Sequence, residues 1–166
     1  MKEHTKASLA SGILLVVLVA LDQCTKFAIA SRMKLHESIE VIKNFFYITY
    51  VQNTGAGFSI FEGYGKPFFA VLTIAALVAI AYYFYHTKDR KIQFCLTIIF
   101  AGAVGNFIDR MALGYVVDFF SFYFFGWGFP VFNIADICIS VGFAMLVIVY
   151  LVDEYKEQKS WKNKQF

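Results

Sequence analysis

The apolar positions of this 166-residue chain fall into four long runs without a charged residue. The runs are Ala7 to Leu21, Pro67 to Tyr85, Ile92 to Ile108 and Ile137 to Val152. A helix needs roughly 17–25 residues to cross a bilayer, and the shorter runs continue into polar clusters that can lie near the membrane surface. The pattern therefore predicts four membrane-spanning helices, at about 7–26, 67–86, 92–111 and 132–152.

Between the first two predicted spans, the composition changes to one typical of strands. Phe45 to Val51 is rich in aromatic and β-branched residues, and Gly55-Ala56-Gly57 is typical of a turn. We expect a small β-sheet, from about 40 to 61, to rest on the outer leaflet, where the aromatic loop Tyr123 to Pro130 also lies. The predicted fold class is an all-α membrane protein with four transmembrane helices and a small extracytoplasmic β-sheet, in a single domain over 1–166.

Lysine and arginine residues gather on one side of the predicted spans. They precede the first span, fill the short 88–91 connection, and follow the fourth span from Lys156 to Lys164. On the other side, basic residues are fewer and mixed with glutamates. Because cytoplasmic loops are enriched in Lys and Arg, both termini are predicted to be cytoplasmic, with residues from about 27 to 66 and 111 to 131 facing outward.

The composition argues against several other classes of protein. The chain is 59% hydrophobic with a net charge of +3, which is too small a charge to indicate nucleic-acid binding. Its three cysteines have no metal or disulfide spacing, its three histidines are scattered, and no metal or cofactor is expected. Leu21 to Cys24 is similar to a lipobox, but Asp22 and Gln23 are not small, so the first span is expected to stay uncleaved.

Polar residues interrupt the apolar runs at helical intervals, always at the outer end of a predicted span. Residues three, four or seven apart share one face of a helix. The faces are Gly102, Asn106 and Arg110 in the third span, Asn133, Asp136 and Ser140 in the fourth, and Asp22 with Lys26 in the first. Asp22 and Lys26 have the spacing of a structural ion pair, and Gly102 lies in a run of small residues that permits close helix approach.

The remaining aspartates require individual interpretation. Asp109 and Arg110 point about 100° apart on a helix, so we favour Arg110 for the site and an interfacial role for Asp109. Asp118 lies in an apolar run past the end of the third helix, where a solvated loop aspartate is unusual. Asp136 could simply stabilise the positive end of the fourth helix. Together with Asn106 and Asn133, however, Asp118 and Asp136 form a candidate site, because polar residues in membrane segments are usually functional.

Two carboxylates brought together in a low-dielectric site share a proton. The ionised group can take a proton from water while the protonated group polarises a carbonyl, so the pair suits hydrolysis. The sequence contains no HExxH helix, and Gly57 to Phe61 lacks the second glycine of a nucleophile elbow.

Five motifs appear in the order found in bacterial lipoprotein signal peptidases, the signal peptidase II family, and the chain resembles this family over nearly its whole length. The motifs are Asp22 to Lys26, Asn53 to Phe58, Gly102 to Arg110, Val116 to Asp118 and Phe132 to Asp136. One departure is Gly57, where an alanine is common in the family.

This resemblance implies a four-helix membrane aspartic endopeptidase with an outer β-cradle and a catalytic dyad of Asp118 and Asp136. Asn53, Gly55, Asn106, Arg110 and Asn133 would bind substrate or support the dyad, whereas Asp22, Lys26, Gly102 and Ala135 would have structural roles. The substrate would be a prolipoprotein signal peptide, cut just before a diacylglyceryl-modified cysteine at the outer boundary of the bacterial cell membrane. Membrane lipids would be the other partners, and the protein would act as a monomer.

The competing interpretation is a small four-span proton- or cation-coupled transporter, whose membrane carboxylates bind the ion. Transporters often contain internal repeats and place their acids near the membrane midplane. This chain shows no repeat, and its acids gather at one end of the spans.

Overall fold

Four helices and a small sheet make up the protein in the computed structural model, which describes residues 2–55 and 65–163. The helices are α1 (Lys2–Arg32), α2 (Gly65–His86), α3 (Arg90–Ala112) and α4 (Ile134–Asn163). Each contains a stretch long and apolar enough to cross a membrane. The predicted fold class, four membrane helices with a small sheet, is therefore confirmed.

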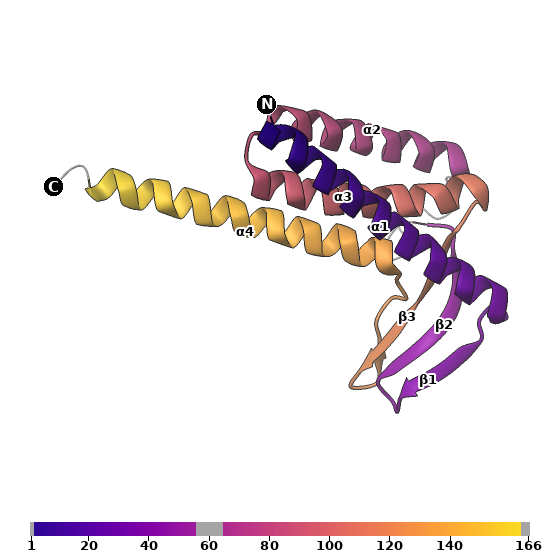
Figure 1. Ribbon diagram of the computed structural model, residues 1–166. Coiled ribbons are helices and arrows are strands. Elements are labelled where there is room, and N and C mark those ends of the chain that lie inside the picture. The colour runs from indigo at the N-terminus through magenta and orange to yellow at the C-terminus, as the bar shows by residue number, and fades with distance from the viewer. Residues whose placement is uncertain (1, 56–64, 164–166) are drawn as a thin grey trace.

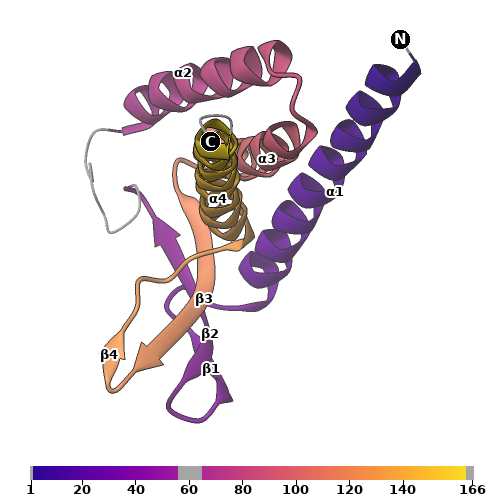
Figure 2. The same cartoon turned by 90° about the vertical axis from the view of Figure 1, so that its left-hand side faces the viewer.

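The α3 helix occupies the centre of the bundle and packs against all three other helices (Figures 1 and 2). Its contact with α4 depends on Gly102, because a methyl group there would collide with the carbonyl oxygen of Ala135 and the side chain of Ile139. Apolar side chains on the outside of the bundle are widely exposed, for example Phe27 at 75% and Val71 at 70%. Such faces are suited to contact with lipid, where a soluble protein would carry polar residues.

The α4 helix continues well past its apolar run, and its charged end projects beyond the other helices (Figure 1). Residues 153–163 contain no glycine or proline and several good helix formers, so nothing in this part of the sequence stops the helix.

A four-stranded antiparallel sheet lies at the opposite end of the bundle (Figure 1). In spatial order the strands are β1 (Ser38–Ile42), β2 (Phe46–Asn53), β3 (Val116–Phe124) and β4 (Trp127–Gly128). The strands β3 and β4 come from the second outer loop, for which no strand was predicted. The β3 segment, VVDFFSFYF, nevertheless has the aromatic and β-branched composition of a strand. Of the expected turn at Gly55-Ala56-Gly57, only Gly55 lies within the described residues, and Gly57 lies outside them.

Alternation along β3 directs Val117 and Asp118 to opposite faces of the sheet. Val117 joins Met33 and Tyr50 in the core beneath the end of α1. Its neighbour Asp118 points the other way, because successive strand residues face opposite sides of a sheet. Gly114, with φ of 89°, provides the tight turn through which the chain passes from α3 into β3.

Candidate active site

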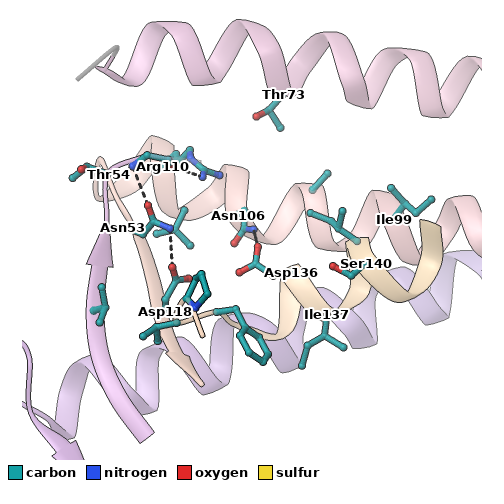
Figure 3. A pocket seen from close by; sticks show the side chains of 18 of the residues that line it. Asn53, Thr54, Thr73, Ile99, Asn106, Arg110, Asp118, Asp136, Ile137 and Ser140 are labelled. Atoms are coloured by element: carbon teal, nitrogen blue, oxygen red, sulfur yellow. Dashed lines mark hydrogen bonds between the residues drawn. The ribbon is translucent and has the colours of Figure 1, made fainter. Parts of the chain in front are cut away.

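A cavity of about 950 Å³ lies where the sheet meets α2, α3 and α4. One end is polar and contains Asp118 and Asp136 (Figure 3). The other end extends between the helices and is lined mainly by apolar residues such as Leu72, Ile99 and Ile139. The cavity therefore joins a pair of carboxylates to an apolar groove at membrane depth.

The start of α4 positions Asp136. Asn133 precedes the helix and accepts a hydrogen bond from the Asp136 amide through Oδ1 (2.9 Å), while Asp136 Oδ2 accepts one from the Asn133 amide (3.1 Å). This reciprocal pair is a capping box, in which the residue before the helix and the third helical residue satisfy each other's amides. The arrangement fixes the backbone around Asp136 and leaves its other carboxylate oxygen, Oδ1, directed toward α3.

Asp118 is 2% exposed, and two carboxamides hold its side chain. Asn133 Nδ2 donates to Oδ1 at 2.6 Å, and Asn53 Nδ2 donates to Oδ2 at 2.9 Å. The sheet register explains the second bond, because Val51 pairs with Asp118 and places Asn53 two residues along on the same face. One asparagine, Asn133, thus contacts both aspartates.

Asn106 completes the connection between the two aspartates. Its Nδ2 donates to Asp136 Oδ1 at 2.7 Å (Figure 3). Its Oδ1 accepts from Asn133 Nδ2 at 3.1 Å and from Lys26 Nζ at 2.9 Å. The two donors at Oδ1 leave Nδ2 as the group that faces Asp136. Within the described residues, the two carboxylates thus accept their hydrogen bonds from neutral amides.

Arg110 lines the cavity and ties two elements together at its edge. Its Nη2 donates to the Gly55 carbonyl at 2.9 Å, and its guanidinium lies 4.9 Å from the ring centroid of Phe69. The Gly55 amide in turn donates to Asn53 Oδ1 at 2.9 Å. Arg110 therefore holds the end of β2, and with it Asn53, to α3 beside the dyad.

A second polar cluster lies on the opposite side of Asn106, between α1, α3 and the start of β3. Lys26 Nζ lies 2.9 Å from Asp22 Oδ2 and 3.2 Å from Asp109 Oδ2, and all three side chains are nearly fully buried. The expected interfacial role of Asp109 is wrong, because the residue is only 3% exposed. The 100° step that turns it away from Arg110 directs it into the protein.

Asp22 also reaches across to α4, where its Oδ1 accepts a hydrogen bond from the Ala135 amide at 2.9 Å. This contact satisfies one of the free amides in the first helical turn. Ala135 itself is fully buried and lies against Gly105. A larger residue in place of Gly105 would collide with the Asp22 carboxylate on α1 and press against Ala135 on α4.

The electrostatics of the dyad result from this geometry. Burial, and next the charge of Asp136, raise the pKa of Asp118 to about 7, against the opposing hydrogen bonds from Asn53 and Asn133. The two aspartates can therefore hold one proton between them near neutral pH. Within the described residues, no group of three or more His, Cys, Asp or Glu is arranged to hold a metal ion.

Two residues of the site were missed in the sequence. Gln23 donates through Nε2 to the Gly105 carbonyl (3.1 Å) and to Asp109 Oδ1 (3.0 Å), and Phe69 stacks on Arg110. Gln23 is three residues before Lys26 and so shares its helix face, which was a usable signal. Phe69 is one of many aromatic residues in an apolar span, and nothing in its spacing distinguishes it.

Comparison with known proteins finds relatives of one kind along most of the chain. A family model described as signal peptidase (SPase) II matches residues 14–152. A lipoprotein signal peptidase of Symbiobacterium thermophilum is 43% identical over 148 residues, or 88% of this chain and 97% of that protein. A lipoprotein signal peptidase of Staphylococcus aureus is 40% identical over 163 residues, or 96% of this chain and 99% of that protein.

Solved structures show the same similarity in three dimensions. One bacterial membrane enzyme structure, at 2.3 Å resolution, superposes with a TM-score of 0.82 and 41% identity over 87% of this chain and 89% of that one. A second, at 1.9 Å resolution, gives a TM-score of 0.78 and 41% identity over 86% and 92% of the two chains.

Proposed function

The chain belongs to the signal peptidase II family, and we propose that Asp118 and Asp136 are the catalytic pair of this membrane aspartic peptidase. The reaction of the family is removal of signal peptides from prolipoproteins. The transporter interpretation loses its support, because the relatives that match along the whole length are peptidases.

One observation supports the proposal above all others: the buried carboxylate of Asp118 and the partly buried carboxylate of Asp136 share a cavity and are held by amides instead of cations. A carboxylate paired with Lys or Arg stays ionised and makes a poor proton donor or acceptor. A carboxylate held by neutral donors can keep or release a proton near pH 7, as the raised pKa of Asp118 indicates.

The chemistry then needs one proton and one water molecule. The ionised carboxylate removes a proton from water as the water oxygen attacks the scissile carbonyl carbon. The protonated carboxyl gives its proton to the carbonyl oxygen, so that a neutral tetrahedral intermediate forms. As that intermediate collapses, the C–N bond breaks, the amine nitrogen takes the proton that came from water, and the gem-diol proton returns to the pair.

The surrounding residues keep this geometry in place. Asn106 and Asn133 orient the dyad through direct hydrogen bonds, and Asn53 does so from β2. Arg110 and Gly55 close the edge of the cavity, where the remaining guanidinium donors suit the carbonyl groups of an extended substrate. Gly102 and Ala135 allow α3 and α4 to approach closely enough for Asn106 to reach Asp136.

The apolar part of the cavity supports a lipid-modified substrate. A diacylglyceryl-modified cysteine could leave its acyl chains in the bilayer while the peptide bond before it reaches the dyad. The basic residues in the 88–91 connection and after α4 support cytoplasmic termini and a site near the outer leaflet. The monomer is the proposed working unit, because the cavity and its polar residues come from one chain.

The test is a gel-shift cleavage assay with two substrates, a diacylglyceryl-modified preprolipoprotein and the same preprolipoprotein without the diacylglyceryl group. We expect Asp118→Asn and Asp136→Asn each to lower cleavage by at least about 10³-fold, because asparagine cannot take up or share the proton. Asp153→Asn, at an exposed surface pair, is the matched control and should cleave normally. Near-normal turnover by either dyad variant would exclude this pair.

A further inference from the structure

Asp109 is a buried carboxylate close to the dyad that has no role in the proposed chemistry. It lies in the last turn of α3, on the side facing away from the cavity, and is 3% exposed. Burial of a carboxylate requires hydrogen bonds and charge compensation, and the structure supplies both. Lys26 lies 3.2 Å from its Oδ2, and Gln23 donates to its Oδ1 at 3.0 Å.

The third contact of Asp109 is with the backbone of the catalytic strand. Oδ2 accepts a hydrogen bond from the Val117 amide at 3.0 Å, and Val117 directly precedes Asp118. The Val117 carbonyl lies 3.4 Å from Asn133 Nδ2. The backbone that carries Asp118 is therefore held to α3 on one side and directed toward the start of α4 on the other.

The connection between α3 and β3 makes this contact important. The helix ends at Ala112, Gly114 takes a positive φ, and β3 begins at Val116. The Leu113 and Gly114 amides still bond to carbonyls of the last helical turn, at 2.7 and 3.1 Å. Beyond this turn, the Val117 amide bonds back to α3 through Asp109, so Asp109 fixes where the strand leaves the helix.

We infer that Asp109 is a positioning residue for the peptidase reaction, which sets the place of Asp118 relative to Asp136 by holding the Val117 amide. The inference rests on the proposed dyad. A displacement of about 1 Å in a catalytic group can cost on the order of 10²-fold in rate, so a backbone anchor one residue away can control the chemical step. Lys26 and Gln23 hold the anchor itself in one orientation.

The first test is Asp109→Asn in the full-length protein, followed by single-turnover cleavage of lipid-modified preprolipoprotein. The amide nitrogen of asparagine would face either Gln23, in the place of Oδ1, or Lys26 and the Val117 amide, in the place of Oδ2, so the side chain can no longer accept from all three partners. We expect the chemical step to slow by about 10- to 100-fold while substrate affinity changes by less than about twofold. Asp153→Asn is the matched control, with expected rate and affinity equal to wild type.

A purely structural role gives a different result. Asp109→Asn would then reduce the folded fraction, measured by thermal unfolding in detergent, while each folded molecule cleaved at the wild-type rate. That outcome overturns the inference. Retained cleavage by Asp118→Asn would instead remove the dyad proposal itself, so the two failures are distinguishable.

A second variant decides the question if Asp109→Asn does not fold. Replacing Val117 by its α-hydroxy acid exchanges the amide N–H for an ester oxygen and keeps the isopropyl side chain. We expect the same slowing of the chemical step, because the donor to Asp109 is gone. The same exchange at Phe125, in the fully exposed turn after β3, is the control. A normal single-turnover rate in the Val117 ester overturns the inference.

Discussion

Two pairs of aspartates lie on either side of Asn106, and they differ in what faces each carboxylate. Asp22 and Asp109 meet the ammonium group of Lys26, at 2.9 and 3.2 Å. Asp118 and Asp136 meet carboxamides and border an open cavity. The first pair is suited to holding helices together. The second pair is suited to sharing a proton and reaching a substrate.

Burial alone does not distinguish the aspartates proposed as catalytic from the others. Asp22 and Asp109, at 1% and 3% exposed, are as buried as Asp118, at 2%. The distinguishing features are the charge of the nearest donor and access to the cavity. Asn106 connects the two groups, because its oxygen accepts from Lys26 and its nitrogen donates to Asp136.

The largest expected stability effect comes from the group around Lys26. Asp22→Ala removes one partner of a buried ion pair and the acceptor for the Ala135 amide. We expect a loss of about 3–5 kcal/mol in the free energy of unfolding, measured by denaturation in detergent. Folded molecules should still cleave. Asp153→Ala breaks an exposed pair and should cost less than about 1 kcal/mol.

Asp118→Asn is the counterpart in the dyad. Asparagine has no charge to bury, and its amide nitrogen faces only one of the two donors, Asn53 or Asn133, so we expect a smaller loss of stability at pH 8 than in Asp22→Ala although cleavage is abolished. An Asp22→Ala protein as stable as wild type, or an Asp118→Asn protein that unfolds easily, would show that the two groups do not divide stability and catalysis in this way.

The sequence was sufficient to identify most residues around the two pairs of aspartates, but it was not sufficient to predict the contacts between them. Helical spacing was sufficient to place Asn106 with Arg110, which share α3, and Asn133 with Asp136, because Asn133 directly precedes α4 and caps its first turn. It could not show that β2 pairs with β3, which joins residues more than sixty positions apart and brings Asn53 to Asp118. Helical spacing also led to the wrong prediction that Asp109 is interfacial, since the partners that bury this residue come from α1 and β3.

The pH dependence of stability also distinguishes the two pairs of aspartates. The raised pKa of Asp118, about 7, means that the native protein keeps a proton that the unfolded chain releases near pH 4. The stability contributed by Asp118 therefore falls as pH rises from about 4 to 7. Asp118→Asn should remove this part of the pH dependence.

For catalysis, loss of the shared proton removes the acid of the pair. We expect kcat/KM for lipid-modified substrate to fall about tenfold per pH unit above pH 7, measured over a pH series in detergent. A rate that stays constant up to pH 9 would show that the pair does not supply the proton.

Substitution of Arg110 is expected to have a smaller effect, because this residue holds the edge of the cavity. Arg110→Lys keeps a positive charge but loses the planar fork that binds the Gly55 carbonyl and stacks on Phe69. We expect substrate binding to weaken by about tenfold, with a smaller change in the chemical step, as measured by single-turnover cleavage over a range of substrate concentrations. Lys91→Arg, at an exposed site on the same helix, is the control. Normal binding with a slowed chemical step would place Arg110 among the catalytic groups.

The smallest effect is expected from replacing all three cysteines by alanine or serine. Cys95 and Cys138 are buried beside the α3–α4 contact, Cys24 is exposed on α1, and none lines the cavity formed by the described residues. A water molecule activated by two carboxylates requires neither a thiolate nor a cation, so cleavage by the folded variant should stay within about twofold of wild type. Treatment of either protein with a chelator should likewise change the rate by less than about twofold. Cleavage that disappeared with the thiols, or that a chelator stopped and a divalent ion restored, would assign the water activation to groups other than Asp118 and Asp136 and would end the distinction between the two aspartate pairs.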